Sequence, residues 1–232
     1  MKGLFCFWYH KTMNNQTKLI FFDLDGTLVD GMEYIYQHLW EYFGIDKAKT
    51  REVLRQYIAK EVSYSDWVQN DVKLLQDAGA TKRGILDAIM TLHPMQGAIA
   101  TIRALQERGY KIFVVSDGID LVIEAVYGDE AKDLFEAIFI NRFQFDESGK
   151  LTGATATEYD MEHKAECIKD MAQKYGVDIK NCVFVGNNEN DVQAALTAGT
   201  SIAFNSKSEK LVEVVTHHVE SKDLFDILKF IN

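Results

Sequence analysis

The chain has 232 residues, of which 47% are hydrophobic and 26% are charged, a balance that is ordinary for a globular protein of one large or two small domains. The formal net charge of −10 argues against a nucleic-acid or anionic-membrane partner, because either would select a basic face, and it favours a small-molecule partner. The cysteines lack metal-ligand spacing and cannot all pair, which is typical of reduced thiols in a cytoplasmic protein. They are Cys6, Cys167 and Cys182. The sequence leaves the oligomeric state open between monomer and homodimer.

Residues 1–17 form an N-terminal extension to which we assign no role, and Met13 is an alternative start. The apolar stretch from Leu4 to Tyr9 is too short to span a membrane, and no small-residue cleavage site follows it. We therefore expect no membrane anchor in this segment.

An apolar run from Leu19 to Phe22 leads directly into two carboxylates, Asp23 and Asp25, and then into a Gly-Thr turn. Consecutive apolar residues of this kind are typical of a parallel strand that is buried on both faces. Asp23 therefore falls at the carboxyl end of the strand, which is where open α/β sheets place their chemistry.

Residues 31–93 change to apolar positions spaced three and four apart, which predicts a run of amphipathic helices. Pro94, the only proline of the chain, marks the return to the main domain. We therefore predict an all-helical cap domain at 31–93, inserted into a core made of residues 18–30 and 94–232.

Beyond the cap, predicted strands and helices alternate, which favours a parallel sheet covered on both faces. The predicted helices cover 96–108, 161–175, a segment from 192 and 224–230. The predicted strands cover 111–115, 137–140, 182–185 and 201–204, and 143–145 with 151–153 form a hairpin. The expected fold class is α/β: a three-layer Rossmann-like core with a small helical cap and a β-hairpin extension.

Polar side chains follow three of these strands, at the point where each strand ends. They are Asp23, Asp25 and Thr27 after the first, Ser116 after the second, and Asn187 and Asp191 after the third. Lys164 lies near the start of the helix before the third of these strands. Because converging carboxylates repel one another, they favour a hard divalent cation such as Mg²⁺, and a hydroxyl and an ammonium beside it would bind phosphate.

Each of these residues also has a purely structural interpretation. Asp25 with Thr27 is typical of a turn, Ser116 of a helix cap, and Lys164 of a solvated helix surface. The occurrence of all of them in one order along the chain favours the functional interpretation.

With these residues in place, the sequence resembles the haloacid dehalogenase-like phosphotransferase superfamily, in its phosphoserine-phosphatase-like branch with a helical cap after the first motif. The segment from Asp23 to Val29 is similar to the first motif, DxDGTLV. Ser116 matches the second motif, Lys164 the third, and the segment from Gly186 to Asp191 the fourth, usually GDGxND. The resemblance covers about the whole chain from Lys18 onward, and four motifs in order are a specific signal.

The resemblance implies a Mg²⁺-dependent phosphomonoester hydrolase that acts on a small phosphorylated metabolite through an aspartyl-phosphate. Asp23 would be the nucleophile, Asp25 the general acid and base, and Lys164 would offset the negative charge. The implied phosphate-binding residues are Thr27, Ser116, Asp117 and Gly118. The implied Mg²⁺ ligands are the Asp23 carboxylate, the Asp25 main-chain carbonyl, and Asn187 and Asp191 of the fourth motif.

Two positions depart from the family pattern. Asn187 replaces a metal-binding Asp, so Mg²⁺ should bind more weakly, because an amide oxygen adds no negative charge. By spacing, Asp71 stands where phosphoserine phosphatases have an arginine for the substrate carboxylate, and Met32 where they have an acid for its ammonium. A carboxylate at 71 would repel the substrate carboxylate, so we expect that phosphoserine is not the preferred substrate.

Two other functions stay open on the sequence. In a phosphotransferase, an alcohol would replace water as the acceptor of the phosphoryl group from Asp23. In a catalytically weak relative, the chain would only bind a phosphometabolite or a partner, and Asn187 motivates this alternative.

Overall fold

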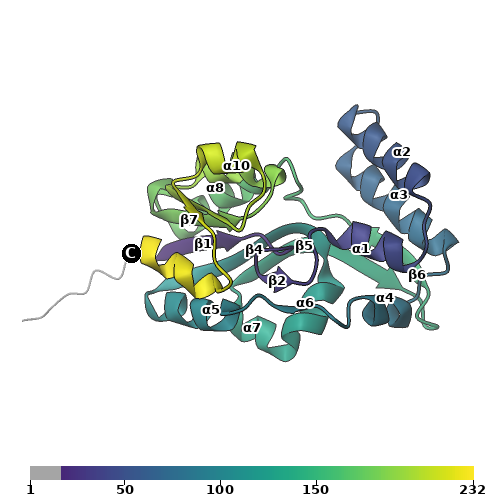
Figure 1. Ribbon diagram of the computed structural model, residues 1–232, viewed down its shortest axis with the longest axis horizontal. Coiled ribbons are helices and arrows are strands. Elements are labelled where there is room, and N and C mark those ends of the chain that lie inside the picture. Colours follow the sequence, from purple (N-terminus) through teal and green to yellow (C-terminus); the bar gives the residue numbers. More distant parts are fainter. Residues whose placement is uncertain (1–16) are drawn as a thin grey trace, which may run out of the picture.

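The computed structural model describes residues 17–232, so the predicted N-terminal extension lies outside the described residues except for Thr17. A seven-stranded sheet in the order β6-β5-β4-β1-β7-β8-β9 forms the centre of the molecule (Figure 1). Its strands are β1 (Lys18–Phe22), β4 (Tyr110–Ile119), β5 (Ala137–Phe145), β6 (Leu151–Thr155), β7 (Cys182–Gly186), β8 (Thr200–Phe204) and β9 (His217–Val219). All neighbouring strands are parallel except the antiparallel pair β5 and β6, which confirms the α/β fold class with its hairpin extension.

Strand β1 lies between β4 and β7, and its four apolar side chains are fully buried. Because side chains alternate along a strand, Leu19 and Phe21 belong to one hydrophobic cluster, whereas Ile20 and Phe22 belong to the other. Phe21 also stacks on Phe113 of β4, with ring centroids 4.9 Å apart. The apolar run that predicts the strand thus builds both halves of the core.

Helices cover both faces of the sheet, as Figure 1 shows. On one face lie α8 (Lys164–Tyr175), α9 (Val192–Thr197) and α10 (Glu209–Val214). On the other lie α5 (Ala98–Glu107), α6 (Asp120–Tyr127), α7 (Ala131–Leu134) and the 3₁₀ helix η4 (Leu224–Phe230). Short 3₁₀ turns are η1 (Gly128–Glu130), η2 (Ile179–Asn181) and η3 (Glu189–Asp191). Across residues 17–232, the helices are all too short or too polar to cross a membrane.

The helical insertion is bounded by two short strands that pair antiparallel, β2 (Val29–Asp30) and β3 (His93–Pro94). Between them lie α1 (Ile35–Tyr42), α2 (Lys47–Ile58), α3 (Tyr64–Asp77) and α4 (Lys82–Ala88). Helix α3 packs along β6, where the Gln69 Nε2 donates to the Ala154 carbonyl (2.6 Å) and the Gln76 Nε2 to the Leu151 carbonyl (3.1 Å). The cap helices therefore rest on the hairpin at the edge of the sheet.

Several predicted boundaries are wrong. Strand β4 does not end before Ser116 but continues to Ile119, with a register shift against β5 after Val115, so the second motif lies within a strand instead of a turn. The helix predicted over 161–175 begins three residues later, at Lys164, and the closing helix is 3₁₀. Pattern alone also missed α6, α10 and β9, which are short.

The packing of α5 predicts a large difference between two leucine truncations. Leu105 of α5 is fully buried, whereas Leu196 of α9 is 58% exposed. We expect Leu105→Ala to lower the free energy of unfolding by about 2–5 kcal/mol. The control Leu196→Ala should change it by less than about 0.5 kcal/mol, because the exposed side chain buries little area, and the helix propensity change is the same in both variants. Urea denaturation measures both, and equal losses would contradict a core beneath α5.

Candidate active site

The end of β1 presents the two carboxylates of the first motif. The Asp23 amide still donates to the Val185 carbonyl of β7 (2.9 Å), so the sheet fixes the backbone of this residue. Asp25 accepts at Oδ2 from the amide of Ile35, the first residue of α1 (2.8 Å). Both aspartates are buried, and Asp25 Oδ1 has no hydrogen-bond partner within the described chain. Asp25 is thus held by the cap and keeps one oxygen free.

The turn after the carboxylates brings the first motif against the fourth. Gly26 has φ +72°, and a Cβ at this position would lie 2.2 Å from the Asn187 Nδ2. Both the backbone conformation and the space therefore require glycine. The next side chain, Thr27, is fully buried, and its hydroxyl has no partner within residues 17–232. A buried hydroxyl without a partner is suited to donate to a ligand oxygen.

Lys164 is the positively charged group at the centre of the site. Its Nζ lies 2.6 Å from Asp23 Oδ1 and 2.8 Å from Asp191 Oδ1, and all three side chains are almost fully buried. Burial lowers the pKa of Lys164, but the charges of Asp191 and Asp23 outweigh it, and the pKa is raised overall. Lys164 therefore stays charged between the first and fourth motifs.

The Asp191 carboxylate is engaged at both oxygens. Oδ1 accepts from Lys164, while Oδ2 accepts from the amides of Asn187 (2.9 Å) and Asn188 (3.1 Å). In this arrangement the Asp191 carboxylate holds Lys164 and the loop of the fourth motif, and its role as a metal ligand stays a prediction. In contrast to the Asp191 oxygens, the Asn187 Oδ1 is buried and has no hydrogen-bond partner within the described chain.

The second motif supplies a hydroxyl from within β4. Ser116 Oγ accepts from the amide of Gly118 (3.0 Å), so its own hydrogen remains free to donate. The same bond engages the Gly118 N–H, which is therefore not free for a phosphoryl oxygen. The Asp117 side chain accepts a hydrogen bond from the Asn190 Nδ2 (3.4 Å). As a carboxylate it would repel the negatively charged phosphoryl group. Of the predicted phosphate-binding residues, Thr27 and Ser116 thus present free hydroxyls.

Carboxylates outnumber positive groups in this site, where Lys164 faces Asp23, Asp25, Asp117 and Asp191. Burial, and then the charge of Asp117, raises the pKa of Asp25 to about 7, although the Ile35 amide and Lys164 oppose the shift. Burial also raises the pKa of Asp23 well above its usual range, with Lys164 opposing. A divalent cation would relieve this excess of negative charge, and the free Asn187 Oδ1 fits a Mg²⁺ ligand.

A family model described as haloacid dehalogenase-like hydrolase matches residues 17–199, which contain all four motifs. The chain belongs to the haloacid dehalogenase-like hydrolases. This hydrolase is 32% identical to the phosphoserine phosphatase of Methanocaldococcus jannaschii, over 94% of this chain and 100% of that protein. It is 28% identical to the phosphoserine phosphatase of Lactococcus lactis subsp. lactis, over 92% and 95% of the two chains.

The chain is also similar to solved structures of phosphoserine phosphatases. A phosphoserine phosphatase solved as a phospho-aspartyl intermediate analogue is 30% identical, with a TM-score of 0.74 over 94% of this chain and 100% of that chain. A substrate-bound phosphoserine phosphatase complex is 28% identical, with a TM-score of 0.74 over 93% and 99%. These findings confirm the resemblance and the predicted enzyme class: the hydrolase is a phosphoric monoester hydrolase.

One residue of the site was not predicted from the sequence. The Asn141 Nδ2 of β5 lies 2.7 Å from the Asp117 carbonyl, 2.9 Å from the Tyr64 hydroxyl and 3.3 Å from the Tyr36 hydroxyl. It therefore joins the second motif of the hydrolase to α1 and α3 of the cap. Asparagine is common in turns, and Asn141 directly follows the predicted strand 137–140. The sequence therefore offered no reason to expect this contact with the cap.

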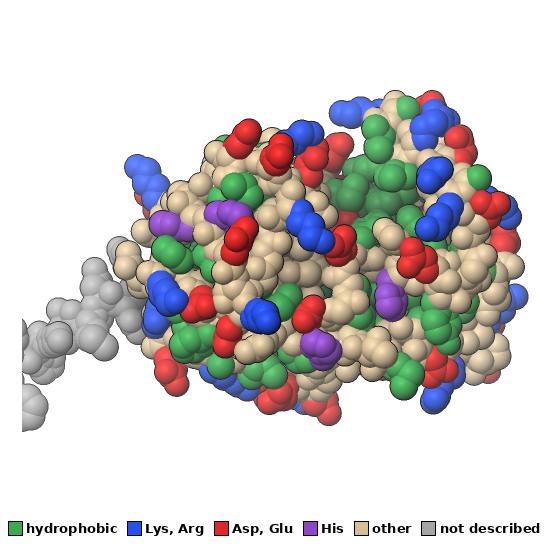
Figure 2. All heavy atoms as spheres, viewed as in Figure 1, with side chains coloured by type: hydrophobic (Ala, Val, Ile, Leu, Met, Phe, Trp, Pro, Cys, Tyr) green, Lys and Arg blue, Asp and Glu red, His purple; other side chains and the backbone are tan. Residues whose placement is uncertain are grey.

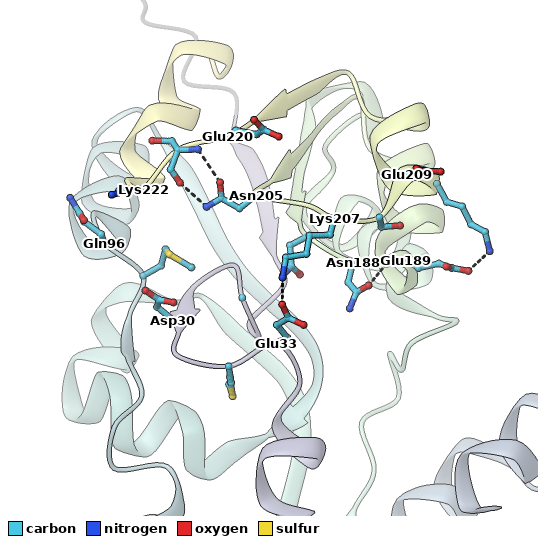
Figure 3. A pocket seen from close by; sticks show the side chains of 17 residues that line it. Asp30, Glu33, Gln96, Asn188, Glu189, Asn205, Lys207, Glu209, Glu220 and Lys222 are labelled. Atoms are coloured by element: carbon cyan, nitrogen blue, oxygen red, sulfur yellow. Dashed lines mark hydrogen bonds and ion pairs between the residues drawn. The ribbon is translucent and has the colours of Figure 1, made fainter. Parts of the chain in front are cut away.

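Two hollows border the site of the hydrolase. A groove of about 1070 Å³ reaches Gly26 and Asn187, and the exposed ion pair of Lys207 with Glu33 lies across it (Figure 3). Figure 2 shows a second hollow, lined by hydrophobic side chains, between the α8 and α10 side of the core and cap helices α2 and α3. The groove thus reaches the first motif at Gly26, beside the fourth motif.

The contact between Gly26 and Asn187 predicts a specific loss of activity. We expect Gly26→Ala to lower kcat/KM by about 100-fold, because displacing Asn187 by an ångström misplaces the reacting groups. Gly176→Ala is the matched control, since φ is +65° and no atom lies within 4 Å of the added Cβ. Both variants should lose about 1 kcal/mol of stability through backbone strain alone. Equal activity of the two variants would contradict the contact.

Proposed function

We propose that this phosphatase is a Mg²⁺-dependent phosphomonoester hydrolase that acts on a small phosphorylated metabolite by transferring the phosphoryl group first to Asp23 and then to water. One observation carries the proposal: Lys164 binds Asp23 Oδ1 at 2.6 Å in a buried site. Within residues 17–232 no hydrogen bond engages Asp23 Oδ2. The ammonium thus orients the carboxylate and leaves an oxygen free to attack phosphorus.

The neighbouring side chains fit the two displacements. Asp25 donates a proton to the leaving alcohol and then takes one from the attacking water, and the Ile35 amide holds its other oxygen in place. The free hydroxyls of Thr27 and Ser116 donate to the phosphoryl oxygens, while Lys164 offsets their negative charge. The solved phospho-aspartyl intermediate analogue of a phosphoserine phosphatase supports a covalent step on the aspartate.

The residues present fit a divalent cation at this site. The Asp23 carboxylate, the Asp25 main-chain carbonyl and Asn187 Oδ1 would hold Mg²⁺, with Asp191 behind them as a positioning residue. When bound, the ion would supply further positive charge to the transferring phosphoryl group. Asn187 keeps the family's oxygen ligand but removes one negative charge, so we retain the expectation of weak Mg²⁺ binding.

The relatives inform the choice of substrate. The first relatives and solved structures reported above are named phosphoserine phosphatases, which weighs against the expectation that phosphoserine is not preferred. Phosphoserine therefore belongs in the first set of substrates to test. The cytoplasmic location and the oligomeric state stay predictions.

The nucleophile is tested by Asp23→Asn. We expect Mg²⁺-dependent hydrolysis of p-nitrophenyl phosphate to fall about 1000-fold or more, because an amide oxygen does not attack phosphorus. The control Asp129→Asn removes a fully exposed carboxylate of η1, whose ion-pair partner is Lys132, and should leave activity unchanged. Activity that survives in Asp23→Asn would rule out the covalent mechanism.

The metal site is tested by Asn187→Asp. We expect the Mg²⁺ concentration that gives half-maximal activity to fall about tenfold, because the added carboxylate strengthens binding of a hard cation. A Mg²⁺ titration of p-nitrophenyl phosphate hydrolysis measures this. Unchanged or weaker dependence would remove Asn187 from the ligand set, whereas activity that appears only in Asn187→Asp would favour a wild-type protein that mainly binds its ligand.

A further inference from the structure

Asp71 of α3 is a buried carboxyl group without a partner. The residue is fully buried, and neither of its oxygens has a hydrogen-bond partner within the described chain. Burial alone raises the pKa of Asp71, and no positively charged side chain opposes the shift. A group of this kind is costly to bury unless a ligand satisfies it.

A group of aromatic side chains lies on the cap helices near this carboxyl group. Trp67 lies one helical turn before Asp71 on α3, and its ring is 6.2 Å from that of Tyr36. Tyr34 lies 5.7 Å from Tyr36 and 6.1 Å from Trp40, measured between ring centroids. We call these four residues, Tyr34, Tyr36, Trp40 and Trp67, the aromatic cluster. The Tyr34 hydroxyl and both indole N–H groups are also buried without partners among residues 17–232.

The cluster adjoins the reaction site. Tyr34 directly precedes Ile35, whose amide holds Asp25, and the Tyr36 hydroxyl lies 3.3 Å from the Asn141 Nδ2 that binds the second motif. After burial itself, the negative charges of Asp71 and Asp117 are the next causes that raise the pKa of Tyr34 and of Tyr36. Asp71 of the cap and Asp117 of the second motif are thus both close enough for their charges to act on these two tyrosines.

We propose that Asp71 and the aromatic cluster bind an ammonium group on the leaving alcohol, so that the enzyme prefers phosphomonoesters of amino alcohols to those whose leaving group is only anionic. This inference rests on the proposed phosphatase function and specifies phosphomonoesters of amino alcohols as the substrate class. The Asp71 carboxylate pairs with the positive charge, and the ring faces attract it through their quadrupoles. The ammonium also supplies the positive charge that this buried carboxyl group lacks.

Phosphoethanolamine and phosphoserine both carry such an ammonium, and phosphoserine adds a carboxylate that Asp71 repels. Phosphoglycolate, of similar size, carries only the carboxylate. We expect wild-type kcat/KM for phosphoethanolamine to exceed that for phosphoglycolate by about tenfold or more, with phosphoserine between them. Equal values for phosphoethanolamine and phosphoglycolate would overturn the proposal, and this comparison needs no variant.

The Asp71→Asn variant assigns the preference to the residue. We expect the ratio of kcat/KM between phosphoethanolamine and phosphoglycolate to fall toward one, mainly through a higher KM for phosphoethanolamine. The matched control on the same helix is Asp77→Asn, because Asp77 is exposed and should leave the ratio unchanged. A normal ratio in folded Asp71→Asn, with only a lower melting temperature, would make the carboxyl group structural and overturn the assignment.

A failure of the proposed function is distinguishable from a failure of this inference. Wild-type protein that does not hydrolyse p-nitrophenyl phosphate with Mg²⁺ contradicts the proposed function. Calorimetric titration with phosphoethanolamine then tests the ammonium site alone. Binding that weakens about tenfold in Asp71→Asn supports the site, and equal binding by both proteins overturns it.

Discussion

The structure depends on one buried ammonium. Lys164 bridges Asp23 at the end of β1 and Asp191 after β7, and all three charged side chains are almost fully buried. Removing Lys164 would leave two buried carboxylates without a compensating charge, which is strongly destabilising. Lys164 is also the first residue of α8, where the helix dipole disfavours a positive charge, so both carboxylates are required to hold it there. The nucleophile is thereby oriented before any substrate binds.

The second constraint joins the chemistry to the cap. The Ile35 amide fixes Asp25, and Asn141 connects the second motif to tyrosines of α1 and α3. The acid that would protonate the leaving alcohol lies in the core, but the inserted segment that would bind the alcohol also holds this acid in place. If the cap binds the alcohol as proposed, a change of cap residues would alter substrate choice without moving Asp23 or Lys164, which is consistent with one family serving many substrates.

The sequence predicted the parts of this arrangement that depend on pattern. The apolar run of β1 and the polar ends of three strands were enough to predict the α/β fold and the convergence of the first, second and fourth motifs. The sequence pattern did not predict features that are determined by tertiary contacts. The strand through Ser116 is extended by pairing with β5, and the contacts of Asp191 with Lys164 and two loop amides were not predicted. Asn141 and the burial of Asp71 depend on cap packing, which residue spacing does not encode.

The central claim is that the phosphoryl group is carried by the carboxylate that Lys164 orients. The most direct test is to quench the enzyme with acid during turnover of a radiolabelled phosphomonoester and to reduce the trapped acyl phosphate with borohydride. This reduction converts the modified aspartate to homoserine, which mass spectrometry locates in the sequence. The account predicts homoserine at residue 23 and nowhere else. Modification of another residue, or turnover without any trapped phosphoenzyme, would contradict it.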